Sequence, residues 1–260
     1  MTWHPDMPDE YRNQIVTGDA LQLWASIPDC SIDAVIIDPP YCAGAISEAQ
    51  RTRANGQGLR NENIKRFGWF VGDNMGTAGL SWLLRNTAIE AMRTCKPSGH
   101  YLTFCDWRMI PAIEPAIESA GLRWQGLVVW DKGHYGLGLG FRHQHECILH
   151  FSCGAPEYHD LSKGDVLQAA RVRSEDRVHQ TQKPVDLLVQ LIEVVTPSGG
   201  VVLDVFGGSA SIAEACIVTG RNYVVFEIDP AIAESARTRI EQAPVPLFTT
   251  MQPEQLTLAV

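Results

Sequence analysis

The run Ile36-Ile37-Asp38-Pro39-Pro40-Tyr41 decides how the rest of the chain is interpreted. The apolar residues 34–37 predict a buried strand of a parallel sheet, and the prolines must end it because they cannot donate a ladder hydrogen bond. A carboxylate, proline-linked carbonyls and an aromatic ring follow its carboxyl end. Together they suit a planar group bearing an NH₂, with Asp38 accepting its protons and Tyr41 stacking on its face. The alternative is a strand that ends in an ordinary polar turn.

Composition limits the class of protein. With 260 residues, 45% of them hydrophobic and 20% charged, the chain suits one large α/β domain or two small ones. The seven cysteines form no Cys-x-x-Cys pair, which indicates reduced thiols rather than disulfides or a zinc site, so no metal is expected. No apolar run reaches about 18 residues and the N-terminus lacks a signal-peptide pattern. We therefore expect a soluble, cytoplasmic protein without membrane contact.

Segments with strand and helix patterns alternate along the chain, which predicts a doubly wound, mainly parallel α/β sheet. The strands 126–130 and 146–151, joined by the glycine-rich residues 133–140, are expected to form an antiparallel pair. Residues 96–99 are expected to be a turn, and residues 152–178 an irregular segment. The expected strands are 14–16, 34–37, 100–104, 126–130, 146–151, 201–205 and 223–227. The expected helices are 20–26, 82–95, 107–120, 183–195, 211–219 and 230–241.

Ligands of such sheets bind beyond the carboxyl ends of the strands. The polar residues expected there are Asp19, Asp38, Asp204 and Glu227, with the turn 206–209. Two glycines in that turn allow close backbone approach, and an acidic residue about 20 positions later is typical of a ribose-binding carboxylate. The turn lacks Gly-x-Gly-x-x-Gly, so a nucleoside without phosphates suits it better than a dinucleotide. A purely structural βαβ turn is the alternative.

Four segments are expected to differ in role. Residues 1–243 are expected to form one catalytic domain, and 244–260 a Pro-rich tail. Residues 42–80 lose periodicity and are rich in glycine and basic residues, which favours either an insertion that contacts DNA or a solvated loop. Residues 152–180 are short and polar, and carry basic residues. The basic residues of these two segments are Arg51, Arg53, Arg60, Lys65, Arg66, Arg171, Arg173 and Arg177.

Motifs spread over residues 14–240 resemble those of the β-group DNA amino-methyltransferases, which use S-adenosylmethionine to methylate adenine N6 or cytosine N4. The matching runs are Gly18-Asp19, Asp38-Pro39-Pro40-Tyr41, Lys96-Pro97-Ser98-Gly99, Trp130-Asp131-Lys132, Phe141-Arg142, His145-Glu146, Thr181-Gln182-Lys183-Pro184, residues 204–211, and Gly220-Arg221-Asn222-Tyr223 through Glu227. They occur in the family's order, with the catalytic half before the cofactor half. The resemblance implies a Rossmann-like methyltransferase sheet that is circularly permuted, and it makes residues 152–180 a short target-recognition segment.

The resemblance also implies roles for individual residues. It makes Asp38, Pro39, Pro40 and Tyr41 the catalytic loop, which also borders the cofactor. It places around the methionine part of the cofactor Thr181, Gln182, Lys183, Asp204, Phe206, Gly207, Gly208 and Ser209. Glu227 would hold the ribose hydroxyls and Asp19 the adenine edge. The family usually has Pro, Ala and Gly where this chain has Val205, Gly208 and Ala210, which leaves cofactor binding intact with an altered affinity.

The expected activity is site-specific methylation of adenine N6 in double-stranded DNA. The base would be flipped out of the duplex to reach Asp38. Within the family, Asp at the first loop position goes mostly with adenine, and Tyr41 would stack better on a two-ring purine. The alternatives are cytosine N4, an RNA or a protein glutamine amide, and a non-enzymatic DNA-binding relative. The net charge of −9 requires DNA contacts to come from local basic clusters, and a homodimer is left open.

Overall fold

The computed structural model describes residues 4–40, 76–136, 139–172 and 182–243. Within these residues the strands form one eight-stranded sheet in the order β1-β8-β7-β2-β3-β5-β4-β6. The strands are β1 (Gln14–Thr17), β2 (Ile32–Ile37), β3 (Cys95–Cys105), β4 (Arg123–Asp131), β5 (His145–Ser152), β6 (Val166–Gln168), β7 (Val201–Asp204) and β8 (Asn222–Glu227). The α-helices are α1 (Ala20–Leu23), α4 (Thr77–Thr94), α5 (Ile110–Glu118), α6 (Val185–Val195), α7 (Ser211–Thr219) and α8 (Pro230–Glu241), and short 3₁₀ helices cover Asp9–Tyr11, Trp24–Ser26 and Trp107–Met109.

The sheet is mostly parallel, which confirms the expected fold class. Strands β1, β8, β7, β2 and β3 pair in parallel, and β6 pairs in parallel with β4. Strand β5 runs antiparallel to both β3 and β4. The expected antiparallel pair at 126–130 and 146–151 is therefore confirmed as β4 and β5.

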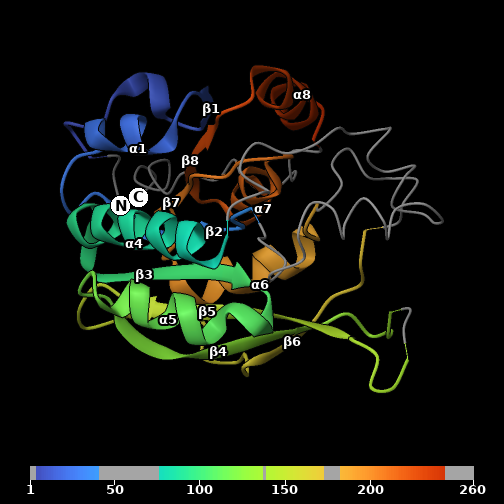
Figure 1. The fold of residues 1–260 in the computed structure, drawn as a ribbon. Helices are drawn as coiled ribbons and strands as arrows, with labels where there is room; N and C mark the ends of the chain where they lie inside the picture. The colour runs from blue at the N-terminus through green and yellow to red at the C-terminus, as the bar shows by residue number, and fades with distance from the viewer. Residues whose placement is uncertain (1–3, 41–75, 137–138, 173–181, 244–260) are drawn as a thin grey trace, which may run out of the picture.

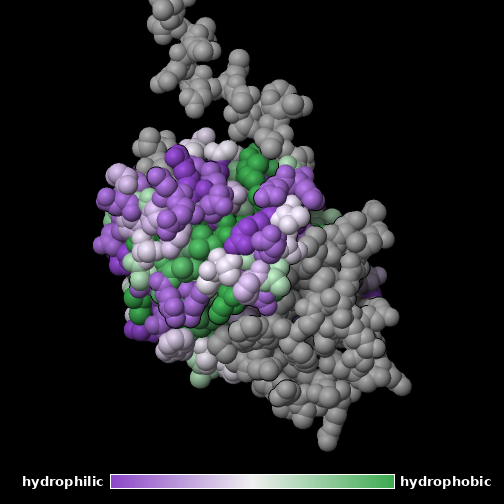
Figure 2. Space-filling view, turned by 90° about the horizontal axis from the view of Figure 1, so that it is seen from above, coloured by the Kyte–Doolittle hydropathy of each residue, from purple (hydrophilic) through white to green (hydrophobic). Residues whose placement is uncertain are grey.

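Each face of the sheet carries its own hydrophobic core. In β2, Val35 packs with Leu84 of α4 on one face, while Ile36 packs with Leu188 of α6 on the other. This alternation follows from the two-residue period of a strand. Helices α4 and α5 cover the first face, and α6, α7 and α8 cover the second (Figure 1). Seen from above in Figure 2, the described surface is largely hydrophilic with hydrophobic residues between.

The structure corrects three local expectations. The expected turn 96–99 lies inside β3, which begins at Cys95 because Ile32 pairs with that residue. A Cβ on Gly99 would lie 2.9 Å from the Asp33 carbonyl oxygen, so glycine permits this close approach. The segment expected to be irregular contains β6, paired with β4. Finally, Pro184 is the residue before α6 rather than part of its first turn.

Several expectations fall on residues that the structure does not describe. They include residues 42–75 of the expected insertion, residues 173–180 of the segment 152–180, and the tail 244–260. Among the described helices, none is both long and apolar enough to cross a membrane.

Candidate functional site

Four parallel strands bring the predicted polar residues together along the carboxyl ends of the strands, which we call the binding edge of the sheet. Strands β1, β8, β7 and β2 are consecutive neighbours, so their carboxyl ends lie side by side. Asp204 and Glu227 are the last residues of β7 and β8, and Asp38 directly follows β2. Asp19 follows β1, where its carboxylate accepts a hydrogen bond from the Leu21 N–H and caps α1. The sequence prediction that these residues gather at strand ends is correct.

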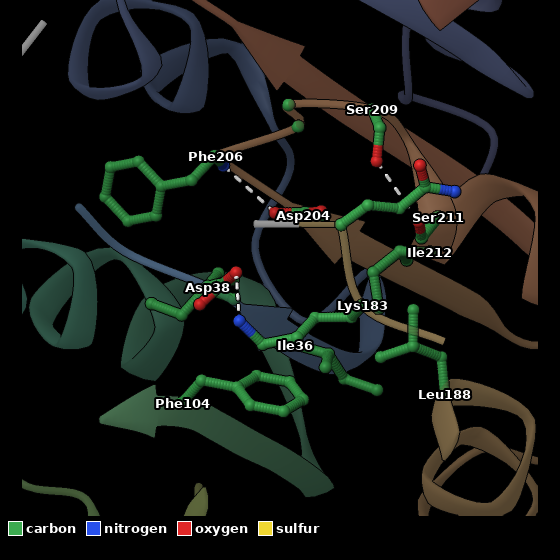
Figure 3. Close-up of a pocket in the computed structure, with 14 residues that line it drawn as sticks. Ile36, Asp38, Phe104, Lys183, Leu188, Asp204, Phe206, Ser209, Ser211 and Ile212 are labelled. Atoms are coloured by element: carbon green, nitrogen blue, oxygen red, sulfur yellow. Dashed lines mark hydrogen bonds and ion pairs between the residues drawn. The ribbon is translucent and has the colours of Figure 1, made fainter. Parts of the chain in front are cut away.

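A pocket opens between β2, β3 and the turn that follows β7 (Figure 3). Its lining combines charged side chains with apolar ones and with glycine backbone. The lining residues are Ile36, Ile37, Asp38, Phe104, Gln182, Lys183, Leu188, Asp204, Phe206, Gly207, Gly208, Ser209, Ser211 and Ile212. It thus includes eight of the predicted site residues: Asp38, Gln182, Lys183, Asp204, Phe206, Gly207, Gly208 and Ser209.

The other predicted site residues either lie around the pocket or are outside the part of the chain that the structure describes. Asp19 and Glu227 are not part of its lining but stand at the neighbouring strand ends, where the Gly18 N–H donates to the Glu227 carbonyl at 2.9 Å. Pro39 is buried and Pro40 half-buried, directly after Asp38. Tyr41 and Thr181 lie outside the described residues.

A chain of four alternating charges forms one wall of the site. Lys183 Nζ lies 2.5 Å from Asp38 Oδ2 and 3.6 Å from Glu146 Oε2. Glu146 Oε1 in turn lies 2.5 Å from Lys132 Nζ. The Lys183 side chain is only 7% exposed and its ammonium also lies 4.8 Å from the centre of the Phe104 ring. Two carboxylates and two ammonium groups therefore balance one another in a largely buried setting.

The pKa shifts of this network reflect a balance between burial and neighbouring charges. Burial acts to lower the pKa of Lys183, but the charges of Asp38 and Glu146 outweigh it and raise the pKa above its usual value. Burial likewise acts to raise the pKa of Glu146, but Lys183 and Lys132 bring it below its usual value. Burial lowers the pKa of Lys132 more than Glu146 raises it. Lys183 thus presents a permanent positive charge to Asp38.

Sequence reasoning assigned no role to Glu146 and Lys132. Both occur in runs that match the family, yet the strands beside them, 126–130 and 146–151, were expected to be an antiparallel pair and not part of the binding edge. One signal could have identified Glu146: it is a carboxylate near the start of a strand whose next residues, 147–149, are all buried. A charge at such a position needs a partner of opposite sign, because an unpaired buried charge is very costly.

The turn after β7 is shaped by backbone contacts. The Phe206 N–H donates to Asp204 Oδ1 at 3.0 Å, and the Gly207 N–H donates to the Phe226 carbonyl at 2.8 Å. A Cβ on Gly207 would lie 2.5 Å from a Val225 methyl, so only glycine fits between the turn and β8. Gly208 has a φ of 50°, a left-handed conformation that glycine adopts readily.

The two carboxylates beside this turn have different surroundings. Burial raises the pKa of Asp204 to about 7, the charges of Asp38 and Glu227 add to the rise, and the Phe206 N–H opposes it. Glu227 is held by backbone donors: its Oε2 accepts from the Gly208 N–H at 2.7 Å and its Oε1 from the Asp229 N–H at 2.9 Å. Each oxygen of a carboxylate can accept a further hydrogen bond, so Glu227 can still bind hydroxyl groups.

The donors and acceptors of this edge fit S-adenosylmethionine. Asp204 offers an acceptor for an ammonium group, Glu227 offers acceptors for ribose hydroxyls, and Lys183 offers a cation. Phe206 offers an aromatic face, and the narrow Gly207 turn lets a ligand approach the backbone. Among the described residues there is no group of three or more His, Cys, Asp or Glu that could hold a metal ion.

Comparison with known proteins identifies the family. The sequence model of the DNA methylase family N6_N4_Mtase matches residues 32–238. A protein of Escherichia coli (strain K12), YubD, is 28% identical over 216 residues, which cover 83% of this chain and 85% of YubD. The solved structure of the PvuII DNA methyltransferase (cytosine-N4-specific) has a TM-score of 0.67 at 16% identity and covers 89% of each chain. The M1.HpyAVI–SAM complex has a TM-score of 0.63 at 20% identity, covering 87% of this chain and 98% of the other.

The two solved structures show that the fold is shared. The family match covers the Asp38 loop, the Lys183 network and the Asp204–Glu227 edge. Methylases of this family take their methyl group from S-adenosylmethionine, in agreement with the expected cofactor. The chain therefore belongs to the N6_N4_Mtase family of DNA methylases, the amino-methyltransferases that depend on S-adenosylmethionine.

Proposed function

We propose that this protein transfers a methyl group from S-adenosylmethionine to N6 of a flipped adenine in double-stranded DNA. The observation that carries the proposal is the adjacency of two different surfaces in one pocket. Asp38 supplies an ionised acceptor, and the Asp204–Ser209 turn supplies a narrow, glycine-lined cradle. An acceptor for an NH₂ and a cradle for an amino acid–nucleoside conjugate are what an amino-methyltransferase needs side by side.

Asp38 has the main task in the chemical step. An exocyclic amine donates its lone pair into the ring and is a poor nucleophile. Asp38 is a weak base, with an ordinary pKa of about 3.9, so it is suited to accepting a hydrogen bond from the NH₂ rather than to removing its proton beforehand. That hydrogen bond helps the nitrogen become tetrahedral as it attacks the methyl carbon, whose bond to sulfur would break as the bond to nitrogen forms. A preorganised anion stabilises the positive charge that develops on the nitrogen, which would then release its surplus proton to Asp38 or to water. Lys183, at 2.5 Å, fixes the orientation of Asp38 and keeps it ionised.

The remaining site residues would hold the methyl donor. Bound S-adenosylmethionine supplies a sulfonium-activated methyl group. Asp204, Phe206, Gly207, Gly208 and Ser209 would surround its methionine part, with Thr181, Gln182 and Lys183 beside them. Glu227 would accept hydrogen bonds from the ribose hydroxyls, and Asp19 from the adenine amine.

The wider chain would serve DNA binding. Pro39, Pro40 and Tyr41 would complete the catalytic loop, with Tyr41 stacking on the flipped base. Residues 42–80 would contact DNA and residues 152–180 would take part in target recognition, all within a single catalytic domain over 1–243. The order of the chain, with Asp38 before the Asp204 turn, supports the permuted β-group arrangement.

Cytosine N4 is the second candidate target. The structure of the cytosine-N4-specific PvuII enzyme has the same fold, which keeps this possibility open for the chain. Adenine is favoured because Asp at the first loop position goes mostly with adenine in this family, and because Tyr41 gains more stacking area from a purine.

The test is the identity of the modified base. DNA from cells that express the protein is digested to nucleosides and separated by mass spectrometry, with an Asp38→Ala strain as the matched control. N6-methyladenine that depends on Asp38 is the expected result. N4-methylcytosine alone would reassign the target, and methyl transfer only to RNA or protein would overturn the proposal. Long-read sequencing of the same DNA identifies the target sequence.

A further inference from the structure

The connection between β4 and β5 projects from the reactive edge of the sheet. β4 runs parallel to β6 and antiparallel to β5, and β5 runs antiparallel to β3, so β4 ends at the same edge as β2 and β3. Figure 1 shows this connection extending beyond the body of the sheet at the end of β4. The connection was expected only as a glycine-rich link, and neither the Asp38 pocket nor the cofactor cradle uses it.

This connection exposes large apolar side chains. Leu139 and Phe141 are fully exposed, at 100% and 104%, and Tyr135 is 60% exposed. Trp107, which is 53% exposed, lies beside the connection, with its ring centroid 6.3 Å from that of His143. Grouped exposure of large apolar residues marks an interaction surface, because each exposed residue forgoes the gain from burial.

The connection is also one of the basic segments of an acidic protein. Residues 132–145 contain one Lys, one Arg and three His but no Asp or Glu, in a chain with a net charge of −9. The Arg142 guanidinium lies 3.6 Å from the centre of the Tyr135 ring, a cation–π contact. A guanidinium nitrogen of Arg171 lies 3.9 Å from the position that a Cβ on Gly136 would occupy. Cations interleaved with aromatic rings are suited to a polyanion whose bases can stack.

The base of the connection is held firmly. The Lys132 N–H donates to the Gln144 carbonyl at 3.0 Å, and the Gly136 N–H donates to the His143 carbonyl at 2.8 Å. The Asp131 carboxylate accepts from the Gly133 N–H at 2.9 Å and from the Gln144 side-chain amide at 2.8 Å. The apolar residues therefore project from a braced support.

The same base is joined to the reactive carboxylate. Lys132 is the first residue of the connection, and its ammonium binds Glu146, which faces Lys183 and, through it, Asp38. The charge network thus fixes the connection relative to the atom that would accept the target amine. A duplex whose target base reached Asp38 would lie at the end of the strands from which this connection projects.

We propose that Phe141, with Leu139, is a wedge that inserts into the DNA duplex beside the target base and stabilises its flipped state. This inference rests on the proposed function and names the device that opens the duplex. Flipping a base loses its stacking and pairing free energy, and apolar side chains inserted between base steps offset such a loss. Arg142 and Tyr135 would contact the backbone and bases next to the wedge.

The test compares two duplexes that carry the target sequence identified by long-read sequencing. One is fully paired, and the other has a mismatch opposite the target base, which lowers the cost of flipping. We expect the double variant Leu139→Ala/Phe141→Ala to lose about tenfold or more in kcat/KM on the paired duplex and to recover to within about threefold of wild type on the mismatched one. The matched control is Val218→Ala. Val218 is an exposed apolar residue on α7, and this variant should behave as wild type on both duplexes.

A second measurement guards against a folding defect. The double variant should bind S-adenosylmethionine with wild-type affinity in calorimetry and should fail to raise the fluorescence of 2-aminopurine placed at the target position. Unchanged activity, or an equal loss on both duplexes, would overturn the wedge. A change in the sedimentation coefficient of the double variant would also overturn the wedge, because it would show that Leu139 and Phe141 contact a second copy of the chain. A wild-type protein that methylates no duplex would instead overturn the proposed function.

Discussion

The two sides of the pocket are built in different ways. The cradle after β7 occupies consecutive residues and is shaped by backbone N–H groups, such as that of Gly208 to Glu227. The opposite wall joins side chains that are far apart in the sequence, since Lys183 and Asp38 are 145 residues apart. The cradle therefore depends on local conformation, and the wall depends on the whole sheet being assembled. A substitution in the wall should therefore lower the free energy of unfolding more than a substitution of similar size in the cradle.

Removal of the central cation should have the largest effect. Lys183→Gln removes the cation that lies 2.5 Å from Asp38 and leaves Glu146 with one of its two lysines, Lys132. Breaking such a buried ion pair costs about 3–5 kcal/mol. The loss in the free energy of unfolding should be greater at pH 8 than at pH 5, because a carboxylate that has lost its cation takes up a proton more easily. Denaturant unfolding at both values measures it.

The control for this variant is Lys163→Gln. Lys163 forms a surface pair with Asp160 at 3.5 Å, with both side chains about 30% exposed, so the change should cost less than about 1 kcal/mol. Equal losses in the free energy of unfolding for the two variants would show that the buried charges of the wall contribute no more to stability than a surface ion pair does.

The next effect is on chemistry. Asp38→Ala should reduce the rate of methyl transfer by about 10²–10³, the usual result of losing one preorganised charge-stabilising contact. Cofactor affinity should change little, since the cradle lies across the pocket. Single-turnover kinetics and calorimetry separate the two quantities. A variant that retains turnover within about tenfold of wild type would contradict the role given to Asp38.

A smaller effect should appear in the pH dependence of cofactor binding. The pKa of Asp204 is about 7, so this carboxyl group is mostly neutral below that pH and ionised above it. An ammonium group beside Asp204 favours the ionised form, so binding releases a proton below pH 7 and affinity should rise with pH. Between pH 5.5 and 7 the rise should approach roughly tenfold. Calorimetry at both pH values should show a flat profile for Asp204→Asn, and a slope retained in that variant would assign the titration to another group.

The smallest effect concerns the end of the cradle. Ala210 has a φ of 55°, in the left-handed region, where a residue with a Cβ is strained by about 1 kcal/mol. Ala210→Gly relieves that strain but loses a buried methyl group and gains freedom in the unfolded chain. The net change in unfolding free energy should stay within about 1 kcal/mol. A loss as large as that of Lys183→Gln would reverse the comparison between cradle and wall.

Sequence patterns predicted most of the fold and the cradle because these depend on local signals. The bounds of α7 and α8 agree with the expected helices, and Gly220, in the left-handed conformation, ends α7 as such a glycine should. The strand ends at Asp38 and Asp204 follow from buried apolar runs. The wall was not predicted, because nothing near Glu146 in the sequence shows that Lys183 will face it. Strand β6 was missed since three residues carry too little periodicity.

The pairing of β2 with β7 affects how the protein is made. The Val201 N–H donates to the Asp33 carboxylate across 168 residues, so β2 leaves the ribosome long before its neighbour exists. At ordinary rates of synthesis this interval lasts on the order of 10–30 s. Throughout it the nascent chain carries an apolar strand with one edge unpaired, which is open to association with other chains. Because the catalytic strand lies early in the chain, the growing polypeptide carries an edge that needs protection from association until β7 has been made.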